Sequence, residues 1–179
     1  TMRDLGLDKN SIVVFYGDHG EGFDHNYFFA HGQVLYNSSI KIPFIIKMPQ
    51  QKNGKENPTF INNTDILPAL LSLLEIKHPL EIDGKNFLSG EKRDRSYFQT
   101  YDLKKFAIID GRYKFIYSLP DSCLKNGQTE ELYDTKIDPQ ENSDLKNKQN
   151  DIAKNLREQL NHYINQFNMY RSSNIKVEK

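Results

Sequence analysis

Histidines, carboxylates and glycines crowd into residues 15–32, FYGDHGEGFDHNYFFAHG. Asp18 and His19 directly follow an apolar run, and a glycine lies on each side of this pair. A carboxylate and an imidazole on adjacent residues can both reach a divalent cation if the chain turns sharply, which Gly17 and Gly20 permit. Two ligands do not complete a coordination sphere, so we expect the other ligands from elsewhere. The same triplet in isolation is also typical of a solvated turn.

The elements around this cluster favour a site over a simple turn. Residues 11–16 are β-branched and aromatic, which predicts a strand buried on both faces of a parallel sheet. Residues 43–49 predict a second short buried strand with proline at both ends. Open α/β sheets bind ligands at the carboxyl ends of their strands. Asp18 and His19 lie at such a position, and His31 follows twelve residues later, again before a glycine.

Other segments of the N-terminal half predict helices and loops. Residues 1–7 resemble the last turn of a helix, and residues 17–42 predict a long loop with a helical turn near 35–39. Residues 63–74 predict a well-buried helix that is capped by Asn63 or Thr64. The order of strand, loop, strand and helix indicates an α/β architecture.

The pattern changes after about residue 90. Residues 96–101, 105–110 and 113–118 predict short, closely spaced strands, and residues 131–134 predict a further edge strand. A polar loop is predicted over residues 135–150. Apolar residues at helical spacing predict an amphipathic helix over 152–170 that covers one face of an antiparallel sheet. We therefore predict two domains, an α/β core portion over 1–90 and a small α+β subdomain over 91–179.

Composition narrows the classes of partner. Lys plus Arg and Asp plus Glu both number 24, so the net charge is zero and nothing favours nucleic acid or an anionic membrane surface. The single cysteine, Cys123, excludes an internal disulfide framework and a cysteine-based zinc site. No stretch has the length of a membrane span. Because the opening residues TMRDLGL look like the middle of a fold, we expect a fragment, and the segment leaves localisation undetermined.

Five blocks of sequence, in order, resemble the sulfatase family of the alkaline-phosphatase-like superfamily. They cover nearly the whole chain and are YGDHGEG with AHG (16–32), LYNSSIKIPFII (35–46), TDILPALL (64–71), IDGKNFL (82–88) and IDGRYKFIY with ELYDTKIDPQE (109–141). One block would be weak evidence, but the ordered set is specific. The resemblance implies the C-terminal part of an alkaline-phosphatase-like sheet, with a small antiparallel sheet covered by a C-terminal helix.

The resemblance also implies roles for three residues. Asp18 and His19 match metal ligands of the family. His31 matches the basic residue that contacts a sulfate or phosphate oxygen or protonates the departing alcohol, so it is the expected catalytic and substrate-binding residue. With these roles, we predict that Asp18, His19 and His31 converge at the carboxyl ends of strands 11–16 and 43–48. An imidazole titrates near neutral pH and suits either task. Ca²⁺ is the expected metal of a sulfatase, whereas relatives that transfer phosphoethanolamine or glycerophosphate hold Zn²⁺ or Mn²⁺. A histidine ligand leaves this choice open.

The family's nucleophile is absent from this sequence. No CxPxR motif, whose cysteine becomes formylglycine, occurs, and Cys123 is followed by Leu-Lys-Asn, so we interpret it as a bystander. We expect the nucleophile and the remaining ligands in a missing N-terminal half, and this chain alone to be inactive. Three interpretations stay open: a sulfatase acting on a sulfated small molecule or glycan, a transferase relative, or a non-catalytic α+β binding module. The family implies a periplasmic, extracellular or membrane-anchored protein.

If a half of the fold is missing, strand 11–16 lacks its sheet neighbours. We therefore also predict an exposed apolar surface, through which the isolated chain associates.

Overall fold

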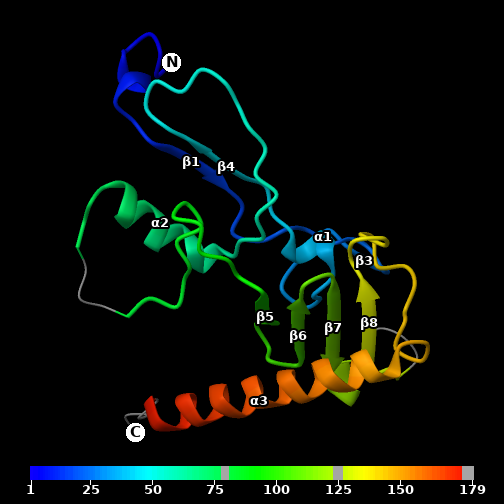
Figure 1. The fold of residues 1–179 in the computed structure, drawn as a ribbon. Coiled ribbons are helices and arrows are strands. Elements are labelled where there is room, and N and C mark those ends of the chain that lie inside the picture. The colour runs from blue at the N-terminus through cyan, green and yellow to red at the C-terminus, as the bar shows by residue number, and fades with distance from the viewer. Residues whose placement is uncertain (78–80, 123–126, 175–179) are drawn as a thin grey trace, which may run out of the picture. The chain divides into compact units, whose positions relative to one another are not determined.

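Two compact units make up the chain. The computed structural model describes residues 1–77, 81–122 and 127–174 (Figure 1). The first unit combines Thr1–Gly20 with Lys41–Arg93, and the second combines Glu21–Ile40 with Asp94–Lys179. The segment 21–40 therefore packs with the C-terminal part of the chain. The assignment of domains to residues 1–90 and 91–179 stays a prediction, and Cys123 lies outside the described residues.

The first unit contains one strand pair and one α-helix. Its elements are 3₁₀ turns at Leu7–Lys9 and Asn63–Asp65, β1 at Val13–Tyr16, β4 at Phe44–Lys47 and α2 at Ile66–Leu73. Residues 2–6 form a turn and not an α-helix, so the helix predicted at the N-terminus is wrong. Gly6 there has φ of 66°, a left-handed conformation that ends the turn.

β1 and β4 pair antiparallel, which corrects the predicted parallel arrangement. The register runs from Val13 opposite Lys47 to Tyr16 opposite Phe44. The carboxyl end of β1 therefore lies beside the amino end of β4. A site at the carboxyl ends of both strands is excluded by this pairing, and only the carboxyl end of β1 leads into Asp18.

The strand pair is also less buried than its sequence predicts. Phe15 is 60% exposed, and its cross-strand partner Ile45 is 59% exposed. The prediction of burial on both faces is wrong, because both of these residues are more than half exposed. The predicted exposed apolar surface is confirmed.

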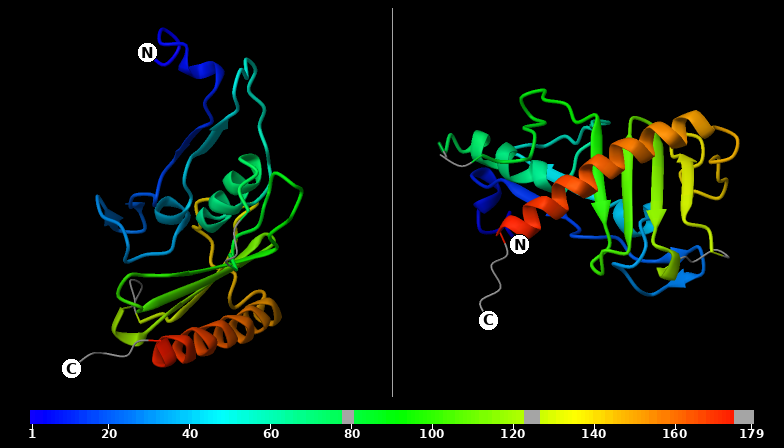
Figure 2. Two further views of the ribbon diagram at one scale, coloured as in Figure 1. Left: turned by 90° about the vertical axis from the view of Figure 1, so that its left-hand side faces the viewer. Right: turned by 90° about the horizontal axis from the view of Figure 1, so that it is seen from below.

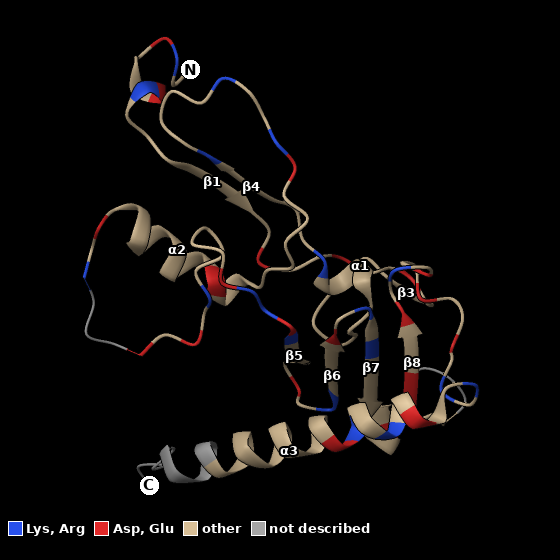
Figure 3. Ribbon diagram, viewed as in Figure 1, with Lys and Arg blue, Asp and Glu red and all other residues tan. Residues whose placement is uncertain are grey.

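The 3₁₀ turn that leads into α2 begins with a reciprocal cap. Asn62 accepts a hydrogen bond from the Thr64 amide, while Asp65 accepts one from the Asn62 amide. The predicted capping residues, Asn63 and Thr64, lie inside the preceding 3₁₀ turn instead. Pro68 is in the first turn of the helix, where its missing amide costs nothing. The helix carries no charged residue (Figure 3), yet only its Ala69 is buried, so the predicted thorough burial is wrong.

The second unit contains a four-stranded antiparallel sheet, as predicted. Its strands, in spatial order, are β5 at Arg95–Gln99, β6 at Lys105–Asp110, β7 at Tyr113–Ser118 and β8 at Glu130–Asp134. A 3₁₀ turn at Pro120–Ser122 follows β7. Within segment 21–40 lie a short hairpin, β2 at Phe23–Asp24 with β3 at Tyr27–Phe28, and the single helical turn α1 at Asn37–Ile40. The hairpin was missed because its strands have only two residues each.

Each face of this sheet has its own apolar core. Helix α3, Asn150–Asn174, runs along one face (Figures 1 and 2) and buries Ala153, Leu156 and Leu160 there, as the helical spacing predicts. Alternate residues of the strands point to the opposite face, where Ile116 packs with residues 34–36. The predicted mixed α/β fold with a helix-covered antiparallel sheet is confirmed. Among the described residues, no helix has the length and apolar character that a membrane span requires.

Candidate functional site

Asp18 and His19 form an exposed pair directly after β1. His19 Nε2 lies 3.6 Å from Asp18 Oδ1, and the two side chains are 44% and 87% exposed. The His19 Nδ1 atom lies 2.6 Å from the Gly20 carbonyl oxygen. Because a carbonyl only accepts hydrogen bonds, Nδ1 is the donor in this contact, and Nε2 is then the ring nitrogen that can act as a metal ligand.

Two neighbouring segments hold this loop in place. The Gly17 amide donates to the Pro43 carbonyl at 3.3 Å, and a Cβ on Gly17 would come within 3.0 Å of the His19 carbonyl oxygen. Glycine therefore permits the tight turn that the sequence suggested. From the cap of α2, Asn63 Nδ2 donates to the Asp18 carbonyl at 3.1 Å. Sequence patterns gave Asn63 only a capping role, and its contact with the loop depends on the fold.

The pair fits a divalent cation as two of its ligands. Two donor atoms that bind one ion at about 2.1 Å each with tetrahedral geometry lie about 3.4 Å apart. The observed 3.6 Å between Asp18 Oδ1 and His19 Nε2 is close to that value. Over the described ranges, no group of three or more His, Cys, Asp or Glu side chains could hold a metal ion. A complete site therefore needs ligands beyond these two.

His31 belongs to the second unit and follows the β2–β3 hairpin. Its carbonyl accepts a hydrogen bond from the Tyr27 hydroxyl at 2.9 Å, and its Nδ1 lies 3.5 Å from Glu21 Oε2. The His31 side chain is 52% exposed. Glu21 was not singled out by sequence reasoning, although its place in the histidine-rich stretch is a usable signal. Because Asp18 and His19 belong to the first unit, convergence of the three residues stays a prediction.

The backbone after the hairpin is strained. Phe29 has φ of 56° and is 86% exposed, an unusual conformation for a bulky residue. Gly32, with φ of 84°, accepts a hydrogen bond from the Tyr101 amide at 3.2 Å. A Cβ on Gly32 would come within 3.0 Å of the Tyr101 ring, so the glycine allows the loop to lie against the β5–β6 turn.

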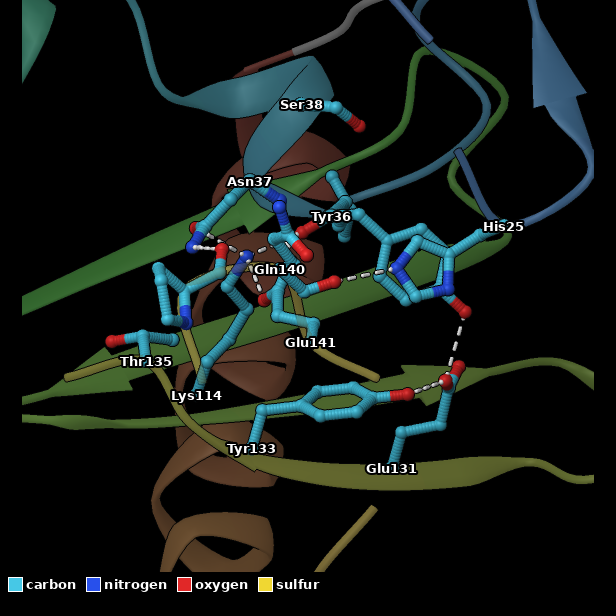
Figure 4. Close-up of polar contacts among 12 residues, drawn as sticks. His25, Tyr36, Asn37, Ser38, Lys114, Glu131, Tyr133, Thr135, Gln140 and Glu141 are labelled. Atoms are coloured by element: carbon cyan, nitrogen blue, oxygen red, sulfur yellow. Dashed lines mark hydrogen bonds and ion pairs between the residues drawn. The ribbon is translucent and has the colours of Figure 1, made fainter. Parts of the chain in front are cut away.

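A buried polar cluster lies beneath α1 (Figure 4). Lys114 Nζ is 2.5 Å from Glu141 Oε1, and the two side chains are 0% and 1% exposed. Burial lowers the pKa of Lys114 and raises the pKa of Glu141, while their mutual attraction opposes both changes. Sequence reasoning missed this pair. The usable signal was the two-residue alternation of β7, which puts Lys114 on the same face as the core residue Ile116.

Two tyrosines share a carboxylate in the same cluster. The hydroxyl groups of Tyr36 and Tyr133 donate to Glu131 Oε2 at 2.8 and 2.5 Å (Figure 4). Burial, reinforced by the charge of Glu131, raises the pKa of both phenols far above the usual range. Both hydroxyl groups therefore stay protonated and keep donating at physiological pH.

Comparison with known proteins agrees with the fold and with the sequence blocks. The family model described as N-sulphoglucosamine sulphohydrolase, C-terminal, matches residues 23–166, a range that includes His31 and begins after Asp18 and His19. The solved structure of a 2-O GAG sulfatase aligns with a TM-score of 0.72 at 27% identity, covering 92% of this chain and 38% of that one. A putative sulfatase from Bacteroides thetaiotaomicron aligns with a TM-score of 0.70 at 29% identity, covering 92% and 38%.

Curated relatives are also sulfatases. An ulvan-active sulfatase of Formosa agariphila is 45% identical over 89 residues, which are 48% of this chain and 17% of that protein. An endo-4-O-sulfatase of Bacteroides thetaiotaomicron is 27% identical over 183 residues, covering 89% of this chain and 35% of that protein. The fold is thus that of alkaline-phosphatase-like sulfatases. The chain belongs to the sulfatase family and corresponds to its C-terminal portion, which is less than half the length of these relatives.

Proposed function

We propose that this chain is the C-terminal portion of a metal-dependent sulfatase that hydrolyses sulfate esters. Asp18 and His19 supply two metal ligands, and His31 contacts the sulfate and protonates the departing alcohol. The nucleophile and the other ligands lie outside these 179 residues, because the sequence has no CxPxR motif. The 179 residues alone are therefore inactive.

The observation that carries the proposal is the geometry of the Asp18–His19 pair. The two donor atoms lie 3.6 Å apart, at a distance that suits a shared ion, and the Nδ1 contact with Gly20 makes Nε2 the nitrogen that can serve as a ligand. Both side chains are exposed, so a ligand can reach them.

The bound metal is proposed to be Ca²⁺, with Zn²⁺ or Mn²⁺ as the alternatives if the protein is a transferase. A divalent cation stabilises negative charge on the ester oxygens. Asp18 contributes an oxygen ligand that suits Ca²⁺, whereas the nitrogen of His19 suits the softer ions better. Metal analysis of the purified protein distinguishes these ions.

The proposed substrate is a sulfated glycan or a smaller sulfate ester. The names of the relatives support a glycan, because one acts on ulvan, another is an endo-4-O-sulfatase and the solved structure is a 2-O GAG sulfatase. These names describe those proteins, and the position of the sulfate on the present substrate is not proposed. The partner that completes the site is the rest of the same protein.

Two variants of the full-length protein test the assignment of roles. Asp18→Ala removes a metal ligand, so we expect loss of bound metal and of sulfate-ester hydrolysis together. His31→Ala leaves both proposed ligands in place, so we expect retained metal and a turnover that falls most for esters with poor leaving groups. Metal content by mass spectrometry and kcat on sulfate esters of graded leaving-group acidity measure both effects.

Matched controls separate these effects from general damage. Asp4→Ala removes an exposed carboxylate of the first unit, and His162→Ala removes an exposed imidazole of α3. Neither should change metal content or turnover. If Asp18→Ala keeps full activity, or if His31→Ala strips the metal, the assignment of roles is wrong. Turnover of phosphate or phosphoethanolamine esters without sulfatase activity would instead support the transferase alternative.

A further inference from the structure

Segment 21–40 carries His31 but is held by the C-terminal sheet of the second unit. We propose that Lys114 and Glu141 are positioning residues for His31, which they fix by clamping residues 35–37. This inference rests on the role proposed for His31 above. It assigns the small C-terminal sheet a part in catalysis, namely orienting a group that touches the substrate.

Lys114 and Glu141, together called the clamp below, bind the start of α1 from two sides (Figure 4). Lys114 Nζ, from β7, donates to the Leu35 carbonyl and to Asn37 Oδ1, at 2.9 Å each. Glu141 Oε2, from the turn after β8, accepts the Asn37 amide at 2.5 Å. Asn37 Nδ2 in turn donates to the Pro139 carbonyl at 2.9 Å. Backbone and side chain of Asn37 are thus both bound, which fixes the position and the orientation of this turn.

A second set of contacts prevents rotation about the clamp. The His25 ring stacks on Tyr36 with centroids 3.8 Å apart and an angle of 14° between the rings. His25 Nε2 also lies 3.0 Å from the Gln140 carbonyl, beside Glu141. At its other end, the Tyr36 hydroxyl donates to Glu131 in β8. The hairpin and the start of α1 are therefore joined to each other and to the sheet.

A series of polar contacts connects α1 with His31. Ser38 Oγ donates to Asp24 Oδ1 at 2.8 Å, and the Ser38 carbonyl accepts the Glu21 amide at 3.0 Å. Glu21 lies beside the His31 ring, and the Tyr27 hydroxyl holds the His31 carbonyl at 2.9 Å. Movement of residues 35–38 would therefore shift both the backbone and the ring neighbour of His31.

The chemistry of the clamp suits orientation better than it suits stability. Removing two charges from water costs about as much as their attraction returns, so a buried ion pair adds little net stability compared with apolar residues. Its directional bonds nevertheless define one position for the groups that it holds. A clamp of apolar side chains could fill the same space without selecting one orientation of the Asn37 turn.

The test compares esters with poor and good leaving groups in the full-length enzyme. Lys114→Met removes both bonds to residues 35–37 and keeps a long side chain in the space. A displaced His31 protonates the leaving alcohol less well, and misplacement by about 1 Å can cost on the order of 100-fold. We expect kcat to fall by about 10- to 100-fold for a poor leaving group and by less than about 3-fold for a good one. A smaller folded fraction would lower both rates equally and leave their ratio unchanged.

Arg157→Met is the matched control on the opposite face of the same sheet. Arg157 lies on α3 and pairs with Glu130 at 2.6 Å, so the variant also replaces a cation with methionine beside a partly buried carboxylate. The variant should leave the ratio of the two rates unchanged. If Lys114→Met yields no folded enzyme, Asn37→Ala tests the same connection at a half-buried position and should change the ratio in the same direction by a smaller factor.

Combining Lys114→Met with His31→Ala shows whether the lysine acts through the histidine. We expect no further change of the ratio in the double variant, because the group being positioned is gone. An unchanged ratio in folded Lys114→Met, beside a changed ratio in His31→Ala, overturns the positioning role alone. An unchanged ratio in His31→Ala overturns the proposed role of His31 and this inference with it.

Discussion

Asp65 should be the most sensitive single position of the first unit. Its side chain is 1% exposed and accepts hydrogen bonds from the amides of Asn62 and Lys85 at 2.8 and 2.7 Å. The Arg93 guanidinium binds the same carboxylate through Nε and Nη2, with a closest approach of 2.5 Å. Asp65→Ala would leave two backbone amides without this acceptor and the largely buried Arg93 cation without its counter-charge, with the Thr64 hydroxyl and the Asp83 carbonyl still within 3.3 Å.

The expected loss follows from these contacts. Breaking a buried ion pair by removing one partner costs about 3–5 kcal/mol. Loss of a helix cap alone costs only about 1 kcal/mol, so the ion pair dominates. We expect Asp65→Ala to lower the free energy of unfolding of the first unit by about 3–5 kcal/mol. Asp65→Asn keeps an acceptor oxygen but not the charge, and should lose about 1–3 kcal/mol.

Urea unfolding of the full-length protein, followed by circular dichroism, measures these losses. Hydrogen exchange localises them, because the amides of Asn62 and Lys85 should lose protection in Asp65→Ala. A loss below about 1 kcal/mol, less than a single cap contributes, would refute the reasoning. Unchanged protection of both amides would also refute it.

The pH dependence provides a second check on Asp65. Burial alone would raise the pKa of Asp65, but hydrogen bonds from Arg93 and from the amides of Lys85 and Asn62 outweigh it, so the net change is downward. A lowered pKa in the folded state contributes stability above the unfolded value of about 3.9. This contribution is lost as the pH falls through the lower folded pKa. The stability difference between wild type and Asp65→Asn should therefore stay constant from about pH 5 to 8 and shrink below about pH 4.

Three further predictions concern packing, association and the metal. Gly84→Ala should destabilise the first unit by about 1–3 kcal/mol, because a Cβ at this position would overlap the Thr64 carbonyl. The control Gly54→Ala should not change stability, because the space around Gly54 is open. Thermal unfolding of the two variants measures the difference. The isolated 179-residue chain should associate through its exposed strand pair, and Phe15→Ser combined with Ile45→Ser should shift it toward monomer in sedimentation velocity; unchanged association in this double variant would contradict the prediction. In the full-length protein, His19→Ala should weaken metal affinity by about 10-fold or more, as measured by competition with a chelator. An affinity equal to that of the wild type would show that His19 is not a metal ligand.

Local patterns in the sequence determined the four-stranded sheet and the long helix of the second unit, but not its β2–β3 hairpin. The alternation of apolar residues and the turn at Asp110-Gly111 define β6 and β7, because neighbouring antiparallel strands need only a short turn between them. The helical spacing of apolar residues likewise defines α3, whose buried face is continuous in sequence. Family motifs, rather than periodicity, identified Asp18, His19 and His31 as candidates.

Only the tertiary structure decided how distant segments meet. The direction of β4 relative to β1 depends on the path of the long connection between them, which no local pattern specifies. The burial of Lys114 and Glu141 depends on segment 21–40 folding back onto the sheet, so two residues that look like surface charges become an internal ion pair. Lys114 contacts Leu35, although the two residues are more than 70 positions apart in the sequence. Such a contact depends on where both segments lie in space, and the pattern of one segment carries no information about the position of the other.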